Sequence, residues 1–276
     1  MNTARNIFLG LFLLSVLVIL VGGLFWASLN FAQSNPGGAE FYRVWSGARA
    51  YSVNALNPYG VIVSEQVQRL VYGRLARAGE PIYRVDVPLH YLLLFTPLAL
   101  VDEVAQARAW WMVFSQVALI ALTLMGVSLA QWRTALPMRV ALVLFGVFWV
   151  HSALAVIDGS LIVVVALLFA AALLALRAES DELAGILLAF ATVKAEAGIL
   201  FLIYILLWSG VQGRWGVWGG FIMTLIVLAG VSWLFQPDWG WEFARAVFAN
   251  LNSGPLVGLG VLLEARLPGV GARASQ

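Results

Sequence analysis

A short set of side chains is available for chemistry in this chain. Its 276 residues include no Cys, two His and a single Lys beside fifteen Arg. The lack of Cys excludes disulfides, thiolate chemistry and Cys-ligated metal ions, and two His are too few for a His-rich metal site. Any chemistry must therefore come from carboxylates, Arg, Lys194, a His and backbone groups.

Glu40 is the first candidate, because it begins an expected helix directly after the helix-breaking segment 35–38. Two interpretations stand side by side. An acidic residue in the first turn complements the positive end of the helix dipole. Alternatively, Glu40 is a general base held in place by Phe41, Trp45 and Ala48, an apolar stripe that recurs at helical spacing.

Lys194 is the second candidate. It lies between two short apolar runs, 183–193 and 197–208, as expected for a broken helix. A Lys between half-helices can meet a phosphate as a point charge, particularly where a helix N-terminus is aimed at the same group. The rival interpretation is an ion pair with Glu196, but residues two apart on a helix do not face each other. The sequence therefore favours anion binding at Lys194.

Other ionisable residues lie near the ends of expected helices. Asp86 and His90 are four residues apart and His151 and Asp158 are seven apart, so each couple shares a helix face. For both couples a structural role is the simpler interpretation, and contact with a substrate is the alternative. The six Arg of the first long polar segment, Arg43 among them, solvate it or contact lipid headgroups, or else clamp a phosphate bidentately.

The elements that position these residues belong to a membrane protein. Hydrophobic residues make up 62% of the chain and charged residues 11%, and the mean hydropathy is +0.91. Soluble domains contain about 25% charged residues, so a water-soluble globule is excluded. The net charge of +2 reflects few charges, and nothing indicates binding to nucleic acid. We expect an all-α integral membrane protein that forms a single membrane domain over 1–276.

The lengths of the apolar runs predict which helices cross the membrane. A bilayer core about 30 Å thick needs about 20 apolar residues per helix. Four runs are long enough: 7–29, 109–130, 138–157 and 215–235. One run just spans (161–176), and four are short: 87–101, 183–193, 197–208 and 255–263. We expect a retained first transmembrane helix over 1–29, a helical bundle over 87–263 with re-entrant or broken helices, and a tail over 264–276.

The segment 30–86 is the one sizeable polar stretch, and we expect it to be a large extracytoplasmic loop. Its apolar stripes at 41–48 and 63–75 predict amphipathic helices at the membrane surface. Basic residues favour cytoplasmic loops. If 87–101 dips in without crossing, the first loop, Asp158, Lys194 and the Trp-rich loop 236–252 share the non-cytoplasmic side. The basic residues on the cytoplasmic side are then Arg5, Arg133, Arg139, Arg177, Arg214, Arg266 and Arg273.

Several short motifs follow one another in a recognisable order. AEFY at 39–42 opens the first loop and leads into WSGARAY at 45–51 and NPYG at 57–60. Later come Tyr83, VPL at 87–89, FTPLAL at 95–100, GS at 159–160, AGIL at 184–187 and VK at 193–194. In this order the motifs resemble glycosyltransferase family 87, whose members resemble polyprenol-phosphate-mannose-dependent α-mannosyltransferases. The resemblance covers roughly residues 1–250 and implies a multi-span GT-C-like helical bundle.

The resemblance implies roles for individual residues. The family's acid in the first outer loop acts as the base, which puts that role on Glu40, where the family usually has Asp. The family's Lys after the Ala-Gly helix falls on Lys194, as a contact to the lipid phosphate. Arg43, His90 and Asp158 are further candidates for substrate binding. No metal ion and no cofactor is expected, because cationic side chains can neutralise a monophosphate leaving group.

The leading hypothesis is a membrane glycosyltransferase on the non-cytoplasmic face of a bacterial plasma membrane. It would move a mannose-like hexosyl group, with inversion, from a polyprenyl-phosphate sugar to a lipid-linked or glycan acceptor, so its partners are that donor, the acceptor and membrane lipids. A transporter of lipid carriers is the first alternative, because broken helices and isolated charges also build transport sites. A non-catalytic scaffold related to the enzyme is the second alternative. It stays open because the chain departs from the family at two positions, with Glu40 in place of the usual Asp and Ser160 where the family often has Gln.

Overall fold

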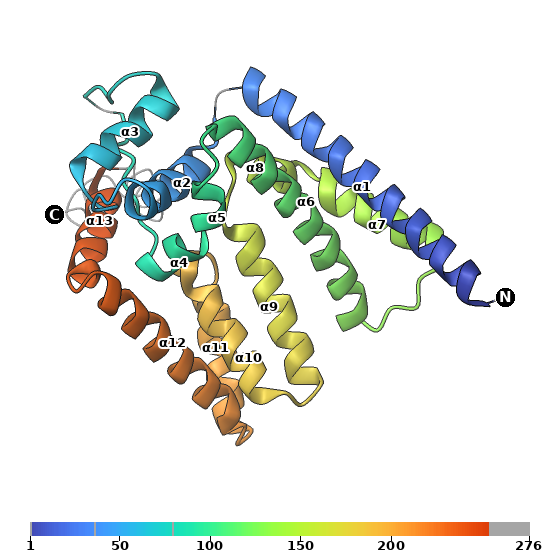
Figure 1. Cartoon of the computed structure of the whole chain (residues 1–276). Coiled ribbons are helices and arrows are strands. Elements are labelled where there is room, and N and C mark those ends of the chain that lie inside the picture. The colour runs from blue at the N-terminus through green and yellow to red at the C-terminus, as the bar shows by residue number, and fades with distance from the viewer. Residues whose placement is uncertain (1, 36, 79, 254–276) are drawn as a thin grey trace, which may run out of the picture.

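The structure is a computed structural model that describes residues 2–35, 37–78 and 80–253 (Figure 1). Every regular element within these ranges is a helix, so the chain is an all-α integral membrane protein, as its composition predicts. The elements are α1 (Asn2–Ser34), α2 (Ala39–Ser52), α3 (Val61–Tyr72), α4 (Leu89–Leu94), α5 (Thr96–Ala99), α6 (Val104–Leu129), α7 (Leu136–Phe148), α8 (Val150–Asp158), α9 (Ile162–Arg177), α10 (Asp181–Phe190), η1 (Ala191–Ala197), α11 (Ile199–Val211), α12 (Trp215–Phe235) and α13 (Trp239–Ser253).

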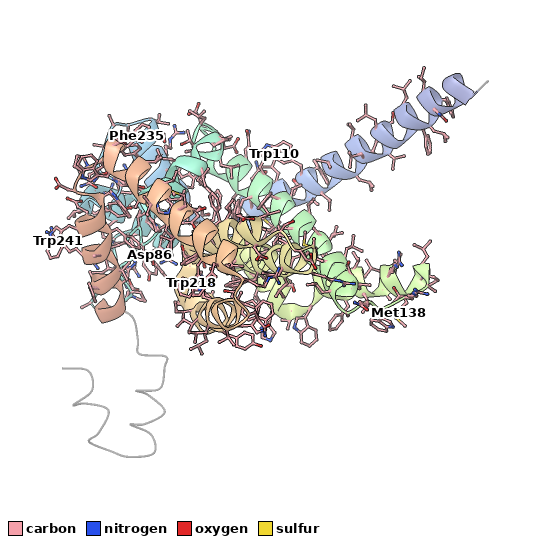
Figure 2. All side chains as sticks on the ribbon, turned by 90° about the horizontal axis from the view of Figure 1, so that it is seen from below. Asp86, Trp110, Met138, Trp218, Phe235 and Trp241 are labelled. Carbon is pink, nitrogen blue, oxygen red and sulfur yellow. The ribbon has the colours of Figure 1, made fainter. Side chains whose placement is uncertain are left out.

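Within the described part of the chain, three helices, α1, α6 and α12, are long and apolar enough to cross a bilayer. Helices α7 and α8 reach this length only together, and they are bent by 51° relative to each other at Trp149, as in a broken span or a re-entrant loop. The outer faces carry large exposed apolar side chains, among them Trp110, Met138 and Phe235, which are labelled in Figure 2. Three of the four predicted runs, 7–29, 109–130 and 215–235, are therefore confirmed as apolar helices of spanning length, whereas the run 138–157 forms the bent pair α7 and α8.

The short apolar runs form broken or reversing segments. The run 87–101 becomes α4 and α5, which meet at Phe95. Helices α10 and α11 are separated by η1, where Lys194 leaves helical geometry with φ −132° and ψ 74°. The chain reverses direction at this break. The ion pair between Arg214, after α11, and Asp181, at the start of α10, shows that the far ends of the two helices lie together. The predicted break is therefore present, and it separates two antiparallel helices.

Glycines set the close packing of α10 against α12. A Cβ atom on Gly185 would lie 2.1 Å from the backbone oxygen of Val217, and one on Gly220 would lie 2.3 Å from the backbone oxygen of Glu182. Neither position has room for a side chain, so the two backbones touch. This contact holds α10, and with it the break at Lys194, against α12.

Helix α2 lies in an apolar cluster, where it packs against α3, α4, α5 and α8 (Figure 1). Helix α2 is thus covered by other helices on more faces than the apolar stripe in its sequence predicts. Gly47 allows one of these contacts, since a Cβ atom there would lie 2.8 Å from Cγ1 of Val85. The buried residues are Glu40, Phe41, Tyr42, Val44, Trp45, Ser46, Gly47, Ala48 and Ala50.

Helix α3 has the amphipathic pattern that its sequence predicts. Val63 and Val67 are buried, whereas Arg69 on the other face is exposed. The helix stops at Gly73, whose φ of 70° is in the left-handed region that ends many helices. Leu75, the last residue of the predicted stripe, therefore lies beyond the helix.

The prediction of a Trp-rich loop at 236–252 is wrong, because this segment forms the helix α13. Pro237 shortly before the helix and Glu242 in its first turn both favour a helix start, a signal that the Trp content obscured. The remaining C-terminal expectations lie outside the described residues; they concern 255–263, the tail 264–276, Arg266 and Arg273.

The glycine contact between α10 and α12 yields a stability prediction. Gly185→Ala should lower the free energy of unfolding by about 1–3 kcal/mol, because the added methyl overpacks the backbone contact. Gly219→Ala is the matched control, since a Cβ atom there meets nothing within 4 Å and Ala is the better helix former. Unfolding in detergent micelles measures both. Equal stability of the two variants would contradict the close contact.

Candidate active site

Glu40 and Lys194 form an ion pair although they lie 154 positions apart in the sequence. The Lys194 Nζ donates to Oε2 of Glu40 at 2.6 Å. The other carboxylate oxygen, Oε1, accepts a hydrogen bond of 2.8 Å from the backbone N–H of Leu161. The exposed fractions of the side chains are 9% for Glu40 and 22% for Lys194. The two candidates that the sequence indicates separately therefore meet in one place.

The carboxylate of Glu40 lies at the N-terminus of α9, because Leu161 directly precedes that helix. The unpaired N–H groups and the helix dipole make this end of α9 electropositive. Ser160 adds two contacts: its Oγ accepts from the backbone N–H of Ile162 at 3.3 Å and lies 3.4 Å from Nζ of Lys194. A helix N-terminus, an ammonium group and a hydroxyl thus converge on one point, an arrangement that suits an anion.

Gly159 brings the start of α9 against the start of α2. Its φ of +71° lies in the left-handed region, and a Cβ atom on it would stand 2.4 Å from Cβ of Phe41. The residue beside Glu40 therefore packs directly on the Gly159 backbone. Trp111 on α6 fixes the same turn, since its Nε1 donates to the Gly159 oxygen at 3.0 Å.

The end of α10 is held by a side chain from α4. Tyr91 donates its hydroxyl to the backbone oxygens of Ala189, at 3.2 Å, and of Phe190, at 2.5 Å. Carbonyl groups at a helix C-terminus lack partners within the helix, so Tyr91 satisfies groups that the break at η1 leaves open. The position of Lys194, four residues after Phe190, depends on this contact.

Arg108 on α6 is a site residue that the sequence analysis missed. Its side chain is fully buried, and it donates to the backbone oxygens of Asn35 at 2.9 Å and Ile157 at 2.7 Å. Its guanidinium also lies over the rings of Tyr42 and Phe31, at 5.9 and 6.0 Å. Arg108 therefore ties the chain before α2 to the end of α8. A lone Arg at the edge of an apolar run was the available signal, but the span predicted at 109–130 began one residue later.

The expected couple of Asp86 and His90 does not form. Asp86 lies three residues before α4 begins, so the four-residue spacing does not place both on one helix. Asp86 forms an ion pair with Arg43, one turn along α2 from Glu40. The His90 ring instead lies 3.0 Å, Nδ1 to Oγ, from Ser232 on α12 and packs edge-on against Trp239.

His151 and Asp158 lie at the two ends of α8, as their spacing predicts. His151 is exposed, and its ring centroid is 6.0 Å from that of Trp149. Asp158 is half-buried two residues before Ser160, and among the described residues its side chain has no hydrogen bond or ion pair. Asp158 is therefore close to the ion pair along the chain, whereas His151 is not.

An apolar cavity of about 250 Å³ adjoins the ion pair. Leu161 and Val193, which precede α9 and Lys194, line it together with Tyr91 and Val164. Its lining also includes Leu94 and Phe114, which are exposed apolar side chains on the outer surface. A second cavity of about 410 Å³ shares Val193, and its largely apolar lining, which includes Phe243 and Val247, also carries the polar side chains of Asp86, Thr192 and Glu196. The segment that leads to Lys194 therefore borders two cavities, and polar side chains of this kind line the second of them.

The comparison with known families decides the identity of the chain. The model of glycosyltransferase family 87 matches residues 88–264, more than half of the sequence. The chain belongs to glycosyltransferase family 87. It is therefore a membrane glycosyltransferase, and the resemblance seen in its motifs is confirmed. No curated protein and no solved structure matches it.

The family match covers only part of the site of this family 87 glycosyltransferase. Arg108, Ser160 and Lys194 lie within the matched residues, whereas Glu40 precedes them. The ion pair joins the two parts. Within the residues that the structure describes, no group of three or more His, Asp or Glu side chains could hold a metal ion.

The ion pair predicts strong coupling between its partners in this glycosyltransferase. Glu40→Gln or Lys194→Met alone should lower the free energy of unfolding by about 2–3 kcal/mol, somewhat less than for a fully buried pair, because each leaves one charge without its partner. The double variant should lose less than the sum, with a coupling energy of about 1–3 kcal/mol. Chemical unfolding in detergent micelles, without substrate, gives all three values.

A second cycle on a surface pair is the control for this coupling. Arg69 and Glu65 lie 3.9 Å apart, N to O, on the exposed face of α3. Glu65→Gln and Arg69→Met should couple by less than about 1 kcal/mol, because water screens an exposed pair. Additive effects at Glu40 and Lys194, equal to those of the surface pair, would show that the buried contact is not formed.

Proposed function

We propose that this family 87 glycosyltransferase transfers a mannose-like hexosyl group from a polyprenyl monophosphate to a hydroxyl of a lipid-linked or glycan acceptor. The observation that carries the proposal is the Glu40–Lys194 pair beside an apolar cavity. A carboxylate can act as a base, an ammonium group can hold a phosphate, and an apolar cavity can hold a lipid chain. The three features together suit a sugar donor that is both anionic and lipid-linked.

Glu40 is the proposed general base. It would take the proton of the acceptor hydroxyl as that oxygen attacks the anomeric carbon on the side opposite the phosphate. The bond from that carbon to the phosphate oxygen breaks, its electron pair leaves with the polyprenyl phosphate, and the configuration at the carbon inverts. The proton on Glu40 then passes to water. The base needs a fixed position for this step, and the contact with Leu161 N–H supplies it.

Lys194 is the proposed phosphate contact, because it can stabilise the charge that develops on the leaving group. In the resting protein the Nζ of Lys194 lies 2.6 Å from Oε2 of Glu40. A donor phosphate would compete for this ammonium group and free Oε2 of Glu40 for the acceptor hydroxyl. Ser160 Oγ, 3.4 Å from Nζ, and the electropositive end of α9 would hold the same phosphate.

The remaining candidates are proposed as contacts of the sugar or the acceptor. Asp86 lines the second cavity, and Arg43 forms an ion pair with it. Carboxylates such as Glu196 accept hydrogen bonds from sugar hydroxyls. Asp158 has a carboxylate without a partner among the described residues, whereas His90 would act indirectly by holding α4 against α12.

The proposed orientation places this site on the non-cytoplasmic face. Arg133, Arg139 and Arg177 line one cavity, and Arg177 and Arg214 line a second. Both cavities lie at the ends of α9 and α11 that point away from Lys194 (Figure 1). Basic residues next to short loops favour the cytoplasm, so the opposite end with Glu40 would face outward.

Replacement of the base tests the reaction. Glu40→Gln should reduce sugar transfer by at least about 100-fold, within the range of about 10²–10⁴ for general base catalysis, because an amide does not accept the proton. The assay follows labelled sugar from a panel of polyprenyl-phosphate sugars to product by purified protein in lipid. Glu65→Gln removes an exposed carboxylate from α3 and should retain wild-type transfer.

Two results would contradict the proposal in different ways. Turnover by Glu40→Gln close to that of the wild type would remove Glu40 from the mechanism but leave the donor class intact. Folded wild-type protein that transfers sugar from none of these donors would contradict the donor class. That second result would favour the transporter or the non-catalytic scaffold.

A substitution that fills the apolar cavity tests whether this cavity holds the lipid chain of the donor. Val164→Phe should raise KM for long-chain polyprenyl donors about tenfold, equivalent to about 1.4 kcal/mol of lost apolar contact, because the ring occupies the cavity. KM for a two-isoprene donor should change little. Ile162→Phe is the control, since Ile162 is exposed on the same helix outside the cavity. Equal effects on both donor lengths would place the chain elsewhere.

A further inference from the structure

A basic cavity lies at the opposite end of the molecule from the ion pair. It measures about 540 Å³ and is bounded by the ends of α6 and α9 and the start of α7. Its lining includes Arg133, Arg139 and Arg177, with Ser128 and Trp132 between them, and no acidic residue. Three positive charges therefore surround one space.

Among the described residues, no carboxylate forms an ion pair with these three Arg. Four other Arg have an acidic partner within 2.7 Å, as in Arg49–Asp102 and Arg74–Glu80. By contrast, the only hydrogen bonds that Arg139 and Arg177 form with described residues go to neutral oxygens. They run from Arg139 Nε to Thr134 Oγ1 at 3.1 Å and from Arg177 to the backbone oxygen of Ser128 at 2.9 Å. Arg133 has no hydrogen bond or ion pair with any residue that the structure describes. The cavity therefore has unsatisfied capacity for an anion.

The position of the cavity indicates that this anion belongs to the membrane. Helix α6 has 26 residues and extends about 39 Å at 1.5 Å per residue, which exceeds the bilayer core of about 30 Å. The helix is therefore long enough to place its two ends, near Glu40 and at this cavity, at the two membrane surfaces. Figure 2 shows Met138, beside Arg139, at the far end of the molecule from Asp86.

The lining also matches the two chemical parts of a lipid. Leu124, one turn before Ser128 on α6, and Val127, directly before it, provide an apolar wall. Trp132 is 53% exposed at the rim, and indole rings favour the headgroup level of a bilayer. A free inorganic anion would use the charges but not the apolar wall.

We propose that this cavity binds the phosphate of an anionic phospholipid, with the phosphodiester among Arg133, Arg139 and Arg177 and the acyl chains along Leu124 and Val127. Basic pockets between transmembrane helices bind such headgroups in other membrane proteins. The inference does not depend on the proposed reaction, because the cavity and the ion pair lie at opposite ends of the molecule.

The test compares lipids that differ in headgroup charge. Native mass spectrometry and thermal unfolding of the full chain in detergent follow the addition of dioctanoyl phosphatidylglycerol, dioctanoyl phosphatidylcholine or inorganic phosphate. The wild type should bind phosphatidylglycerol at least about tenfold more tightly than phosphatidylcholine. Arg133→Gln with Arg139→Gln should abolish this preference, and it should fold because both side chains are exposed.

Arg69→Gln with Arg77→Gln is the matched control, because it removes two exposed charges at the other end of the chain. It should keep the preference of the wild type. The proposal is overturned by undiminished preference in the Arg133 and Arg139 variant, or by an equal loss in the control, which would indicate unspecific charge attraction. Stabilisation by inorganic phosphate equal to that by the lipid would overturn it as well, since the site would then serve a free anion.

Discussion

The ion pair between Glu40 and Lys194 is the interaction on which the arrangement of this glycosyltransferase depends. Charges that are mostly removed from water are costly unless each finds an opposite charge and hydrogen bonds. Here the carboxylate has both, an ammonium group at one oxygen and the Leu161 N–H at the other. This geometry requires three segments far apart in sequence, the start of α2, the start of α9 and the break after α10, to meet at one point. The fold can therefore be understood as the set of contacts that brings these segments together.

Those contacts are made largely by polar groups at helix ends. Each interruption of a helix leaves backbone N–H or C=O groups that the bilayer cannot satisfy. Arg108 donates a hydrogen bond to the backbone carbonyl of Ile157, and Trp111 donates one to that of Gly159. Tyr91 donates to the carbonyl groups at the end of α10. The broken helices are thus tolerated because side chains replace the missing partners. The same side chains also fix the segments next to Glu40 and Lys194. The contacts that satisfy the broken helix ends therefore also position the site.

The sequence predicted what depends on local pattern and missed what depends on contacts between distant elements. Three of the span lengths and the break at Lys194 follow from hydrophobic runs and an isolated charge, and the structure has them. The catalytic role of Glu40 was inferred in the same way and stays a prediction. The partner of Lys194 did not follow, because nothing local joins residues 154 positions apart. The burial of α2 was also hidden, since its stripe is that of a surface helix and only Gly47 hints at a neighbour on another face. Arg108 was missed because it stands at the edge of an apolar run.

The resting ion pair also bears on the order of events in the proposed reaction. Both oxygens of Glu40 are engaged before substrate arrives, one by Lys194 and one by Leu161 N–H. The acceptor hydroxyl alone has no charge with which to displace an ammonium group, whereas a phosphate does. The donor would therefore enter first, draw Lys194 to its phosphate and expose the base. An acceptor that enters the second cavity afterwards would meet a free carboxylate oxygen and a stabilised leaving group together.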